Sequence, residues 1–280
     1  MIRRSRLYMP GNNPKMIQSG RMFHSDVLLL DLEDSVPLTD KLAARILVRE
    51  ALEHLTFENE VMVRINHFPL GRRDLKEIVC ERLDSILYPK CESVHDIEEV
   101  KDVLQKLEKN YAIDKEIEIV AVIETAKGCL HCEEIAHGPR VTALTFGAED
   151  FIADIGGIRS QESLFFLKSM VAISAASAGI QALDTVYPYI DDDEGLKKEA
   201  EESKKMGFCG KGAIHPRQLS IINSVFTPSQ EEIAWAQKVI SVMKEAEEKG
   251  MASAALDGRM IDTPTLKKAR RITAIAEVIS

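Results

Sequence analysis

The sequence predicts a closed (β/α)8 barrel, the TIM-barrel fold, and three observations support this prediction. Short apolar runs alternate along the chain with helical patterns, which implies parallel strands joined by crossover helices. Eight such strand-like runs occur, and eight units favour a closed barrel over an open sheet. At 280 residues and 45% apolar content, the chain is long enough to bury one large core.

The expected strands are short, rich in branched apolar residues and bounded by turn residues. They cover residues 6–9, 27–32, 61–66, 85–89, 117–124, 141–146, 180–187 and 212–215. The expected helices between them cover residues 39–55, 74–83, 93–109, 163–178 and 194–206. Each helix would return the chain to the start of the next strand.

Helical sequence continues beyond the expected eighth strand. Two helical patterns cover residues 230–249 and 263–279, and residues 250–258 between them are rich in glycine and alanine. This segment of roughly 50 residues is shorter than an independent domain of usual size. We therefore expect a catalytic barrel domain at residues 1–226 and a C-terminal helical extension at residues 227–280. The extension is expected to pack on the barrel or on a neighbouring subunit.

Charge and apolar content exclude several classes of partner. The formal net charge of −9 and the pI near 5.4 argue against a general nucleic-acid or membrane surface, which normally requires a basic face. No apolar run approaches 18 residues, and residues 1–11 lack the apolar core of a signal peptide. These observations predict a soluble cytoplasmic protein.

The cysteines predict reduced thiols, because their number, five, is odd and no secretory signal is apparent. Cys129 and Cys132 form a C-x-x-C motif around His131, which is a pattern of zinc or redox sites. No second such motif completes a set of four ligands. We therefore expect thiols packed in a helix near residues 126–137.

Four apolar runs end in an acidic residue, which is costly in a buried strand unless the acid has a partner. These acids are Asp34, Glu124, Asp150 and Asp184. The carboxyl ends of barrel strands converge on one face, where catalytic residues come from several strand ends. The pattern therefore predicts an enzyme.

Nine motifs occur in order along the chain: RRSRLYMPGNNPKM, LLLDLEDSV, VRIN, YPK, AVIETAKG, FGAEDF, SAGIQALDTVY, GFCGKGAIHPRQ and DGRMIDTP. Together they resemble the citrate lyase β-subunit family, which is related to the malyl-CoA and citramalyl-CoA lyases of the HpcH/HpaI aldolase superfamily. The resemblance spans nearly the whole chain. It implies a Mg²⁺-dependent carbon–carbon lyase on a modified TIM barrel, assembled as a homotrimer or a multiple of it.

Glu124 and Asp150 match the metal ligands of this family. Mg²⁺ takes oxygen ligands and keeps several waters, so one or two protein carboxylates suffice when the substrate adds its own oxygens. The structural alternatives are an ion pair between Glu124 and Lys127, and a helix N-cap at Asp150.

The loop of Gly147, Ala148 and Glu149 holds a carboxylate of the keto acid through backbone donors in the family, and its alternative is an ordinary tight turn. Arg64 matches the arginine of the VRIN motif. Its guanidinium could bind the substrate and stabilise an enolate oxygen, or form a salt bridge with a nearby acid.

Glu33 and Asp34 match family positions expected to orient the waters of the metal ion. Asp31 shares a strand face with Glu33, and for Asp31 a structural ion pair is equally expected. Lys90 and Asp184 are further candidates at the barrel mouth, with a structural ion pair as the alternative for each.

Basic residues near the first and last strands are candidates for contacts with CoA or a carrier protein, because those strands are neighbours in a closed barrel. These residues are Arg3, Arg4, Lys15, Lys211 and Arg217. A solvated surface is the alternative for Lys15 and Lys211. His215 has the pKa range of an acid or base, but the His-Pro pair is expected to shape the end of strand eight.

Asp262 matches an aspartate that completes the active site from the C-terminal lid of a neighbouring subunit in related lyases. Asp262 is equally suited to cap the helix that starts at Thr263. The sequence therefore leaves its role as general base open.

The resemblance implies cleavage of a citryl thioester, citryl-CoA or citryl-acyl carrier protein, to oxaloacetate and an acetyl thioester. The partners would be CoA or an acyl carrier protein, with citrate lyase α and γ subunits if the chain acts in a complex. The alternatives are a citramalyl-CoA or malyl-CoA lyase, a pyruvate aldolase that acts on free acids, and a regulatory barrel without catalysis.

Overall fold

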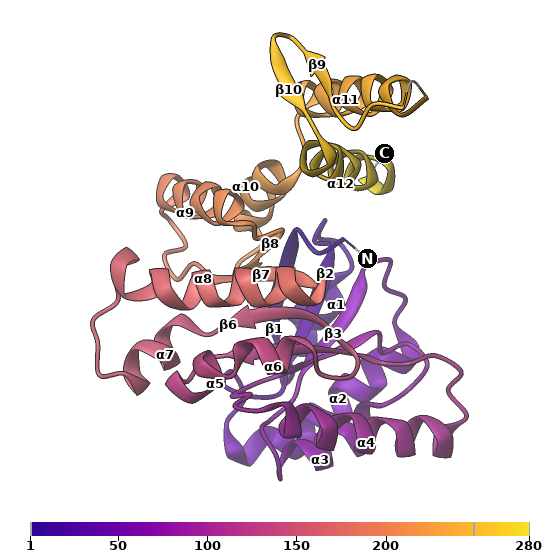
Figure 1. Ribbon diagram of the computed structural model, residues 1–280. Coiled ribbons are helices and arrows are strands. Elements are labelled where there is room, and N and C mark those ends of the chain that lie inside the picture. Colours follow the sequence, from indigo (N-terminus) through magenta and orange to yellow (C-terminus); the bar gives the residue numbers. More distant parts are fainter. Residues whose placement is uncertain (1, 249, 280) are drawn as a thin grey trace. The chain divides into compact units, whose positions relative to one another are not determined.

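Eight parallel strands form a closed barrel in the structure, a computed structural model that describes residues 2–248 and 250–279 (Figure 1). In chain order the strands are β1 Ser5–Pro10, β2 Val27–Asp31, β3 Glu60–Arg64, β4 Ser85–Tyr88, β5 Glu118–Ile123, β6 Val141–Phe146, β7 Gln181–Val186 and β8 Gly210–Ala213. Each strand pairs with the next, and β1 pairs with β8. The predicted (β/α)8 barrel is confirmed.

Closure of the barrel depends on a glycine. In the pairing of β1 with β8, Ser5 lies opposite Lys211 and Leu7 lies opposite Ala213. A Cβ atom at Gly210 would lie 1.8 Å from the carbonyl oxygen of Arg3, closer than any side chain could approach. The glycine therefore lets the last strand reach the first.

The core inside the barrel comes from alternate residues of the strands, as the two-residue period of a strand requires. This cluster contains Val27, Leu29, Met62, Leu87, Val120, Val122, Ala143 and Leu183. The neighbours of these residues in sequence point outward, toward the helices.

The barrel helices follow the strands as expected, with several additional short ones. They are α1 Pro14–Gly20, α2 Lys41–His54, α3 Gly71–Ile78, α4 Val94–Tyr111, α5 Ala126–Leu130, α6 Cys132–Ala136, α7 Ala148–Asp154, α8 Gln161–Ala178, α9 Asp193–Met206 and α10 Arg217–Phe226. Side-chain caps set several starts. Ser93 and Asp96 form a capping box at α4, and Ser160 and Ser163 form one at α8.

Two helices differ from expectation. The helix expected at 74–83 is α3 at Gly71–Ile78, because the backbone becomes extended at Val79. The single helix expected near 126–137 is divided into α5 and α6 at His131, whose ring Nδ1 lies 2.8 Å from the carbonyl oxygen of Glu92. Cys129 and Cys132 are buried free thiols.

The chain divides into two compact units, residues 3–223 and residues 224–279 with residue 2. The second unit contains α11 Gln230–Glu248, β9 Ala254–Leu256, β10 Arg259–Ile261 and α12 Thr263–Ile279. Helix α11 was expected to reach Lys249, which lies outside the described residues. The glycine- and alanine-rich stretch contains most of a hairpin, whose turn has positive φ at Asp257 and Gly258.

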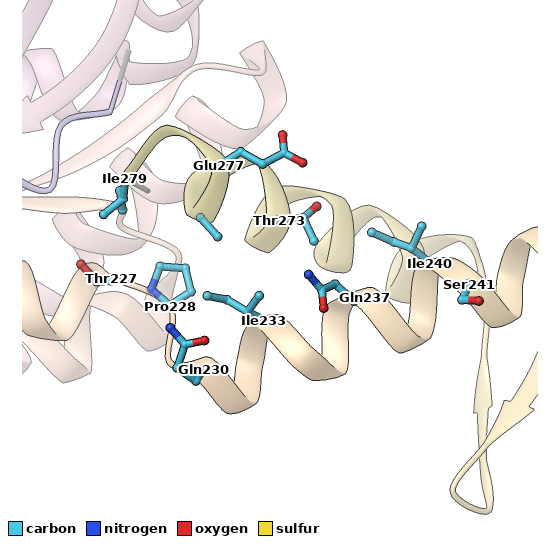
Figure 2. A pocket seen from close by; sticks show the side chains of 11 residues that line it. Thr227, Pro228, Gln230, Ile233, Gln237, Ile240, Ser241, Thr273, Glu277 and Ile279 are labelled. Carbon is cyan, nitrogen blue, oxygen red and sulfur yellow. The ribbon is translucent and has the colours of Figure 1, made fainter.

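Helices α11 and α12 share a small apolar core with β10. Its buried members are Ala236, Val239, Met243, Ile261, Leu266 and Ala269. Ile233, Gln237 and Ile240 of α11 also line a groove of about 730 Å³, with Thr273 on its α12 side (Figure 2). In the described part of the chain, no helix combines the length and apolar character needed to span a membrane.

Candidate functional site

A cavity of about 240 Å³ opens at the carboxyl ends of the barrel strands. Its lining brings together residues that end or follow four different strands: Asp34, Arg64, Glu124 and the loop Gly147, Ala148, Glu149 and Asp150. Tyr8 of β1 and Arg159 also line it. Most of the residues predicted for the metal and the substrate therefore share one small space.

Arg64, the last residue of β3, is surrounded by carboxylates. Its Nε and Nη2 donate to the two oxygens of Asp31 at 2.6 and 2.7 Å. Its Nη1 lies 3.1 Å from oxygens of both Glu33 and Asp34. Burial opposes the charge, but the hydrogen bonds and charge of Asp31 outweigh it and raise the pKa of Arg64. Arg64 therefore forms the salt bridge considered from the sequence, and it also lines the cavity.

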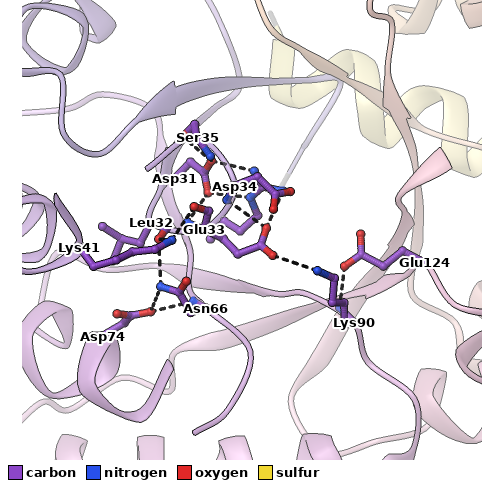
Figure 3. Close-up of polar contacts among 11 residues, drawn as sticks. Asp31, Leu32, Glu33, Asp34, Ser35, Lys41, Asn66, Asp74, Lys90 and Glu124 are labelled. Carbon is purple, nitrogen blue, oxygen red and sulfur yellow. Dashed lines mark hydrogen bonds and ion pairs between the residues drawn. The ribbon is translucent and has the colours of Figure 1, made fainter. Parts of the chain in front are cut away.

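Asp31 shapes the turn after β2. Its carboxylate accepts hydrogen bonds from the backbone N–H of Glu33 at 2.8 Å and from the N–H of Ser35 at 3.0 Å (Figure 3). Burial alone would raise the pKa of Asp31, but Arg64 and these donors hold it below its usual range. This ionised carboxylate positions both Arg64 and Glu33.

Glu33 is buried beside a more exposed acid. Burial raises the pKa of Glu33 to about 7, against the charges of Arg64 and Lys90 and with the help of Asp34. The Nζ atom of Lys90 lies 3.6 Å from Glu33, while Asp34 remains exposed. Glu33 is therefore a buried acid whose neutral form is favoured by its surroundings.

Glu124 follows β5 and is only 4% exposed. Its Oε1 accepts a hydrogen bond of 2.7 Å from the backbone N–H of Lys90, which has a positive φ of 50° (Figure 3). Lys127 pairs with Glu92 at 3.0 Å, so the ion pair considered for Glu124 is wrong. Burial raises the pKa of Glu124 to about 8, with further contributions from the charges of Asp150 and Glu33.

Gly147 brings the next loop against Glu124. A Cβ atom at this position would lie 2.2 Å from Oε2 of Glu124. Gly147 is also the N-cap of α7, so Asp150 lies in the first turn of the helix and is not the N-cap considered from the sequence. The missing side chain therefore allows the loop and Glu124 to meet.

The donor set of this cavity suits a hard divalent cation. Glu124 and Asp150 offer carboxylate oxygens, which Mg²⁺ prefers over nitrogen or sulfur. Among the described residues, the one group of three potential ligands within 4.8 Å of one another is Glu50, Glu53 and His54, exposed on α2. Two protein carboxylates would therefore leave positions for waters and substrate oxygens.

The basic surface expected near β1 and β8 does not form. Arg3 is 2% exposed and pairs with Glu60 at 2.8 Å and Glu118 at 2.5 Å, at the amino-terminal ends of the strands. Arg4 pairs with Asp26 at the same end. These positions contradict a shared patch for a carrier, because the two charges are neutralised at the end of the barrel away from the cavity.

Lys211 and Asp184 are likewise structural. Lys211 is 0% exposed, and its Nζ lies 2.7 Å from Asp184 and 2.5 Å from Glu199. Burial alone would raise the pKa of Asp184, but the charges of Lys211 and Lys168 hold it below its usual range. A carrier contact by Lys211 and a place for Asp184 at the mouth are therefore both contradicted.

Lys15 and Arg217 are exposed, on helices that follow β1 and β8. Arg217 pairs with Asp191 at 2.9 Å, and the Nδ1 of His215 accepts a hydrogen bond from the N–H of Arg217. These two cations remain available at the surface of the barrel unit.

Asp262 lies in the other unit, just before α12. Its carboxylate accepts from the backbone N–H and the hydroxyl of Thr265, at 3.1 and 2.8 Å. These donors lower the pKa of Asp262. The helix cap is present, and the role as general base stays a prediction.

Arg159 is a cavity residue that the sequence analysis missed. It lies between α7 and α8, pairs with Glu149 and lies 3.7 Å from Glu199. Strand ends guided the search, and Arg159 is not near one. The signal that could have found it is a cation in the short loop that follows FGAEDF.

Comparison with known proteins gives consistent results. The family model described as HpcH/HpaI aldolase/citrate lyase matches residues 4–216. The citrate lyase subunit beta of Leuconostoc mesenteroides subsp. cremoris is 34% identical over 282 residues, covering 98% of this chain and 93% of that protein. The mitochondrial citramalyl-CoA lyase of Homo sapiens is also 34% identical, over 99% of this chain and 86% of that protein.

A solved structure is similar over the same span. It is the crystal structure of protein CitE from Mycobacterium tuberculosis in complex with magnesium, acetoacetate and coenzyme A. The TM-score is 0.78 at 29% identity, and the match covers 98% of this chain and 97% of that chain. The similarity therefore includes the C-terminal unit as well as the barrel.

Proposed function

Because the chain belongs to the HpcH/HpaI aldolase/citrate lyase family, we propose that this lyase cleaves a citryl thioester to oxaloacetate and an acetyl thioester, with Mg²⁺. The observation that carries the proposal is the shared cavity of Glu124, Asp150 and Arg64. Magnesium in the similar CitE structure supports the choice of metal.

The proposed reaction is a retro-Claisen cleavage. The hydroxyl of the citryl group loses its proton, and its electrons form the keto group of oxaloacetate. The carbon–carbon bond breaks, its electron pair forms a thioester enolate, and the enolate takes up a proton to give the acetyl thioester. The site must therefore hold a keto acid and stabilise a developing negative charge.

The site residues predicted from the sequence each have a proposed task. Glu124 and Asp150 would hold Mg²⁺, which when bound polarises the substrate oxygens. The loop of Gly147, Ala148 and Glu149 would bind a keto-acid carboxylate through backbone N–H groups. Arg64, fixed by Asp31, would stabilise the enolate oxygen. The acids Glu33 and Asp34 would orient waters next to the metal ion.

Asp262 is the proposed general base, supplied by the C-terminal unit of a neighbouring subunit. Its carboxylate accepts hydrogen bonds from Thr265, and a carboxylate placed beside the substrate hydroxyl can take up its proton. This proposal includes a homotrimer or a multiple of it as the assembly.

The carrier and cellular context complete the proposal. Lys15 and Arg217, exposed after β1 and β8, would contact the phosphates of CoA or of an acyl carrier protein. The enzyme would act in the cytoplasm, alone or with citrate lyase α and γ subunits. The buried free thiols Cys129 and Cys132 agree with a reducing compartment.

A citramalyl-CoA lyase is the second candidate, because the human citramalyl-CoA lyase and the Leuconostoc citrate lyase subunit are both 34% identical to this chain. The two reactions share their chemistry and differ in the keto acid released, pyruvate instead of oxaloacetate. Overall identity therefore does not decide between them.

Turnover of purified chain with citryl-CoA and with citramalyl-CoA tests the proposal. Oxaloacetate and pyruvate are measured by coupled dehydrogenases, with Mg²⁺ and with excess EDTA. We expect oxaloacetate from citryl-CoA, no product with EDTA, and loss of activity in Glu124→Gln. The exposed Arg72→Gln serves as the matched control. The proposed function would be contradicted if the chain cleaved none of citryl-CoA, citramalyl-CoA and citryl-acyl carrier protein.

A further inference from the structure

Arg159 connects the catalytic cavity to the outer helices. The arginine lies in the loop between α7 and α8 and lines the cavity beside Glu149. Its Nη2 lies 3.7 Å from Glu199 of α9, and its side chain is 21% exposed. The guanidinium is thus held at the cavity wall from two sides.

Arg159 and Arg64 are the two positively charged residues among the described residues that line this cavity. Arg64 is held by Asp31 through two of its nitrogens and by Glu33 and Asp34 through the third, and the proposed function assigns it to the enolate oxygen. The interaction of Arg159 differs. Its partner Glu149 is 70% exposed, and ion pairs with solvent-exposed partners contribute little to stability. A ligand carboxylate can therefore replace Glu149 on Arg159 at little cost.

The negative charge of the cavity means that a substrate with a second carboxylate needs a cation such as Arg159. Four acids line it, namely Asp34, Glu124, Glu149 and Asp150. The charge of a bound Mg²⁺ would be balanced by Glu124 and Asp150 together with the first carboxylate of a keto acid. A second substrate carboxylate would then be repelled unless a cation receives it. A guanidinium is suited to this task, because its fork binds carboxylates through two parallel hydrogen bonds.

We propose that Arg159 is the residue that selects the substrate, by binding the second carboxylate of a dicarboxylic keto-acid half. This inference rests on the proposed function. It predicts that the enzyme prefers a citryl thioester, which releases oxaloacetate, over a citramalyl thioester, which carries a methyl group in place of the carboxymethyl arm.

The test compares both thioesters in the wild type, Arg159→Gln and Arg159→Lys. In Arg159→Gln we expect kcat/KM for citryl-CoA to fall about 10- to 100-fold, mainly through KM, as for a lost charged hydrogen bond. The value for citramalyl-CoA should change less than about threefold, within the context dependence of single contacts. Arg159→Lys should recover part of the loss, because it keeps the charge but not the fork.

The ratio of the two kcat/KM values is the decisive quantity, because a general disturbance of the loop would lower both. Arg72→Gln, which breaks an exposed ion pair between Arg72 of α3 and Glu99 of α4, is the matched control and should leave the ratio unchanged. Calorimetric binding of oxaloacetate and pyruvate, with Mg²⁺ present, provides a second readout. Arg159→Gln should weaken oxaloacetate binding and leave pyruvate binding intact.

Failures of the two proposals can be told apart. An unchanged ratio in Arg159→Gln would overturn the role of Arg159 and leave the proposed citryl-thioester lyase standing. A wild-type enzyme that prefers citramalyl-CoA would overturn the role of Arg159 together with the choice of a citryl thioester, in favour of the second candidate. A wild-type chain that cleaves neither thioester and binds neither keto acid would reject both.

Discussion

At the scale of single residues, Glu124 is held by contacts with backbone atoms, which the sequence pattern does not reveal. Its carboxylate accepts from the backbone of Lys90, which adopts a positive φ, and it lies against the bare backbone of Gly147. Neither contact involves an opposite charge. The carboxylate is therefore positioned while remaining poorly compensated, and burial raises its pKa to about 8.

Substitution of Gly147 by alanine tests this contact. The added Cβ would lie 2.2 Å from Oε2 and 2.9 Å from Cβ of Glu124, so the carboxylate or the loop must move. We expect kcat/KM to fall about 100-fold, which is typical of a misplacement near 1 Å. Activity and Mg²⁺ titrations measure the effect.

Gly157→Ala is the matched control for this substitution. The nearest atoms to its added Cβ are at 3.4 Å, an ordinary contact distance, so it should retain wild-type activity. Full activity in Gly147→Ala would show that the close approach is not required.

Asp31→Asn should destabilise the protein by about 3 kcal/mol, because Arg64 loses a buried ionic partner. The fold holds the pKa of Asp31 below its unfolded value, so this stabilisation is complete above about pH 4 and is lost as the pH falls through the folded value. Urea unfolding of both proteins from pH 7 to pH 3 measures the difference. A difference that already declines between pH 7 and pH 5 would contradict this assignment.

Glu124 and Asp184 show what a sequence can and cannot say about a single acid. Both end an apolar run, yet Glu124 follows the end of β5 while β7 continues for two residues past Asp184. Asp184 therefore lies within a strand and pairs with Lys211 outside the barrel core. The face that an acid occupies depends on where the strand stops, and strand ends are the least certain part of a sequence-based assignment.

At the scale of elements, all eight strands could be predicted because each is a short apolar run between turn residues. Their ends were misplaced by at most two residues, as for β8, expected at 212–215 and found at Gly210–Ala213. Loops carried less information. The contacts of Arg159 with Glu149 and Glu199 depend on how three segments meet, and no periodic pattern encodes that meeting.

Ion pairs between elements were also hidden from the sequence. Arg3 finds Glu60 and Glu118 at separations of 57 and 115 residues, so its burial could not be inferred from its neighbours in the chain. The carrier-binding patch was expected because the first and last strands are neighbours in a closed barrel. They do pair, but their adjacency does not reveal which cations are neutralised by distant acids.

Lys211→Met should lower stability and leave carrier recognition intact. The change leaves Asp184 buried between β7 and α9 without its main cationic partner, which costs about 3–5 kcal/mol. Denaturant unfolding measures the loss, and KM for the thioester should stay within about twofold of the wild type. Lys197→Met, on the exposed face of α9, is the control and should unfold like the wild type. A raised KM with unchanged stability would restore the carrier contact.

At the scale of the whole molecule, the two compact units divide the proposed machinery. The barrel unit holds Glu124 and Arg64, and the C-terminal unit holds Asp262. If the base comes from a neighbouring subunit, Glu124→Ala and Asp262→Ala chains should each be inactive alone. Co-assembled by refolding from a mixture, they should recover a measurable fraction of activity, because some sites then combine an intact cavity with an intact Asp262.

Asp262→Asn separates the base from the helix cap in the same experiment. Asparagine keeps an oxygen that can accept from Thr265, so α12 should remain capped while the base is lost. Retained activity in Asp262→Asn, or no recovery in mixed assemblies, would argue against a base contributed by another subunit.

The pairing of β1 with β8 also has a consequence during synthesis. During translation, one edge of β1 can pair with β2 early, but its other edge stays open until β8, Gly210–Ala213, has been synthesised. At about 5–20 residues per second, the nascent polypeptide carries that open edge for roughly 10–40 s. An uncovered strand edge is a template for association with other chains. A low local concentration of nascent chains, or a chaperone that binds this edge, would therefore increase the yield of native protein.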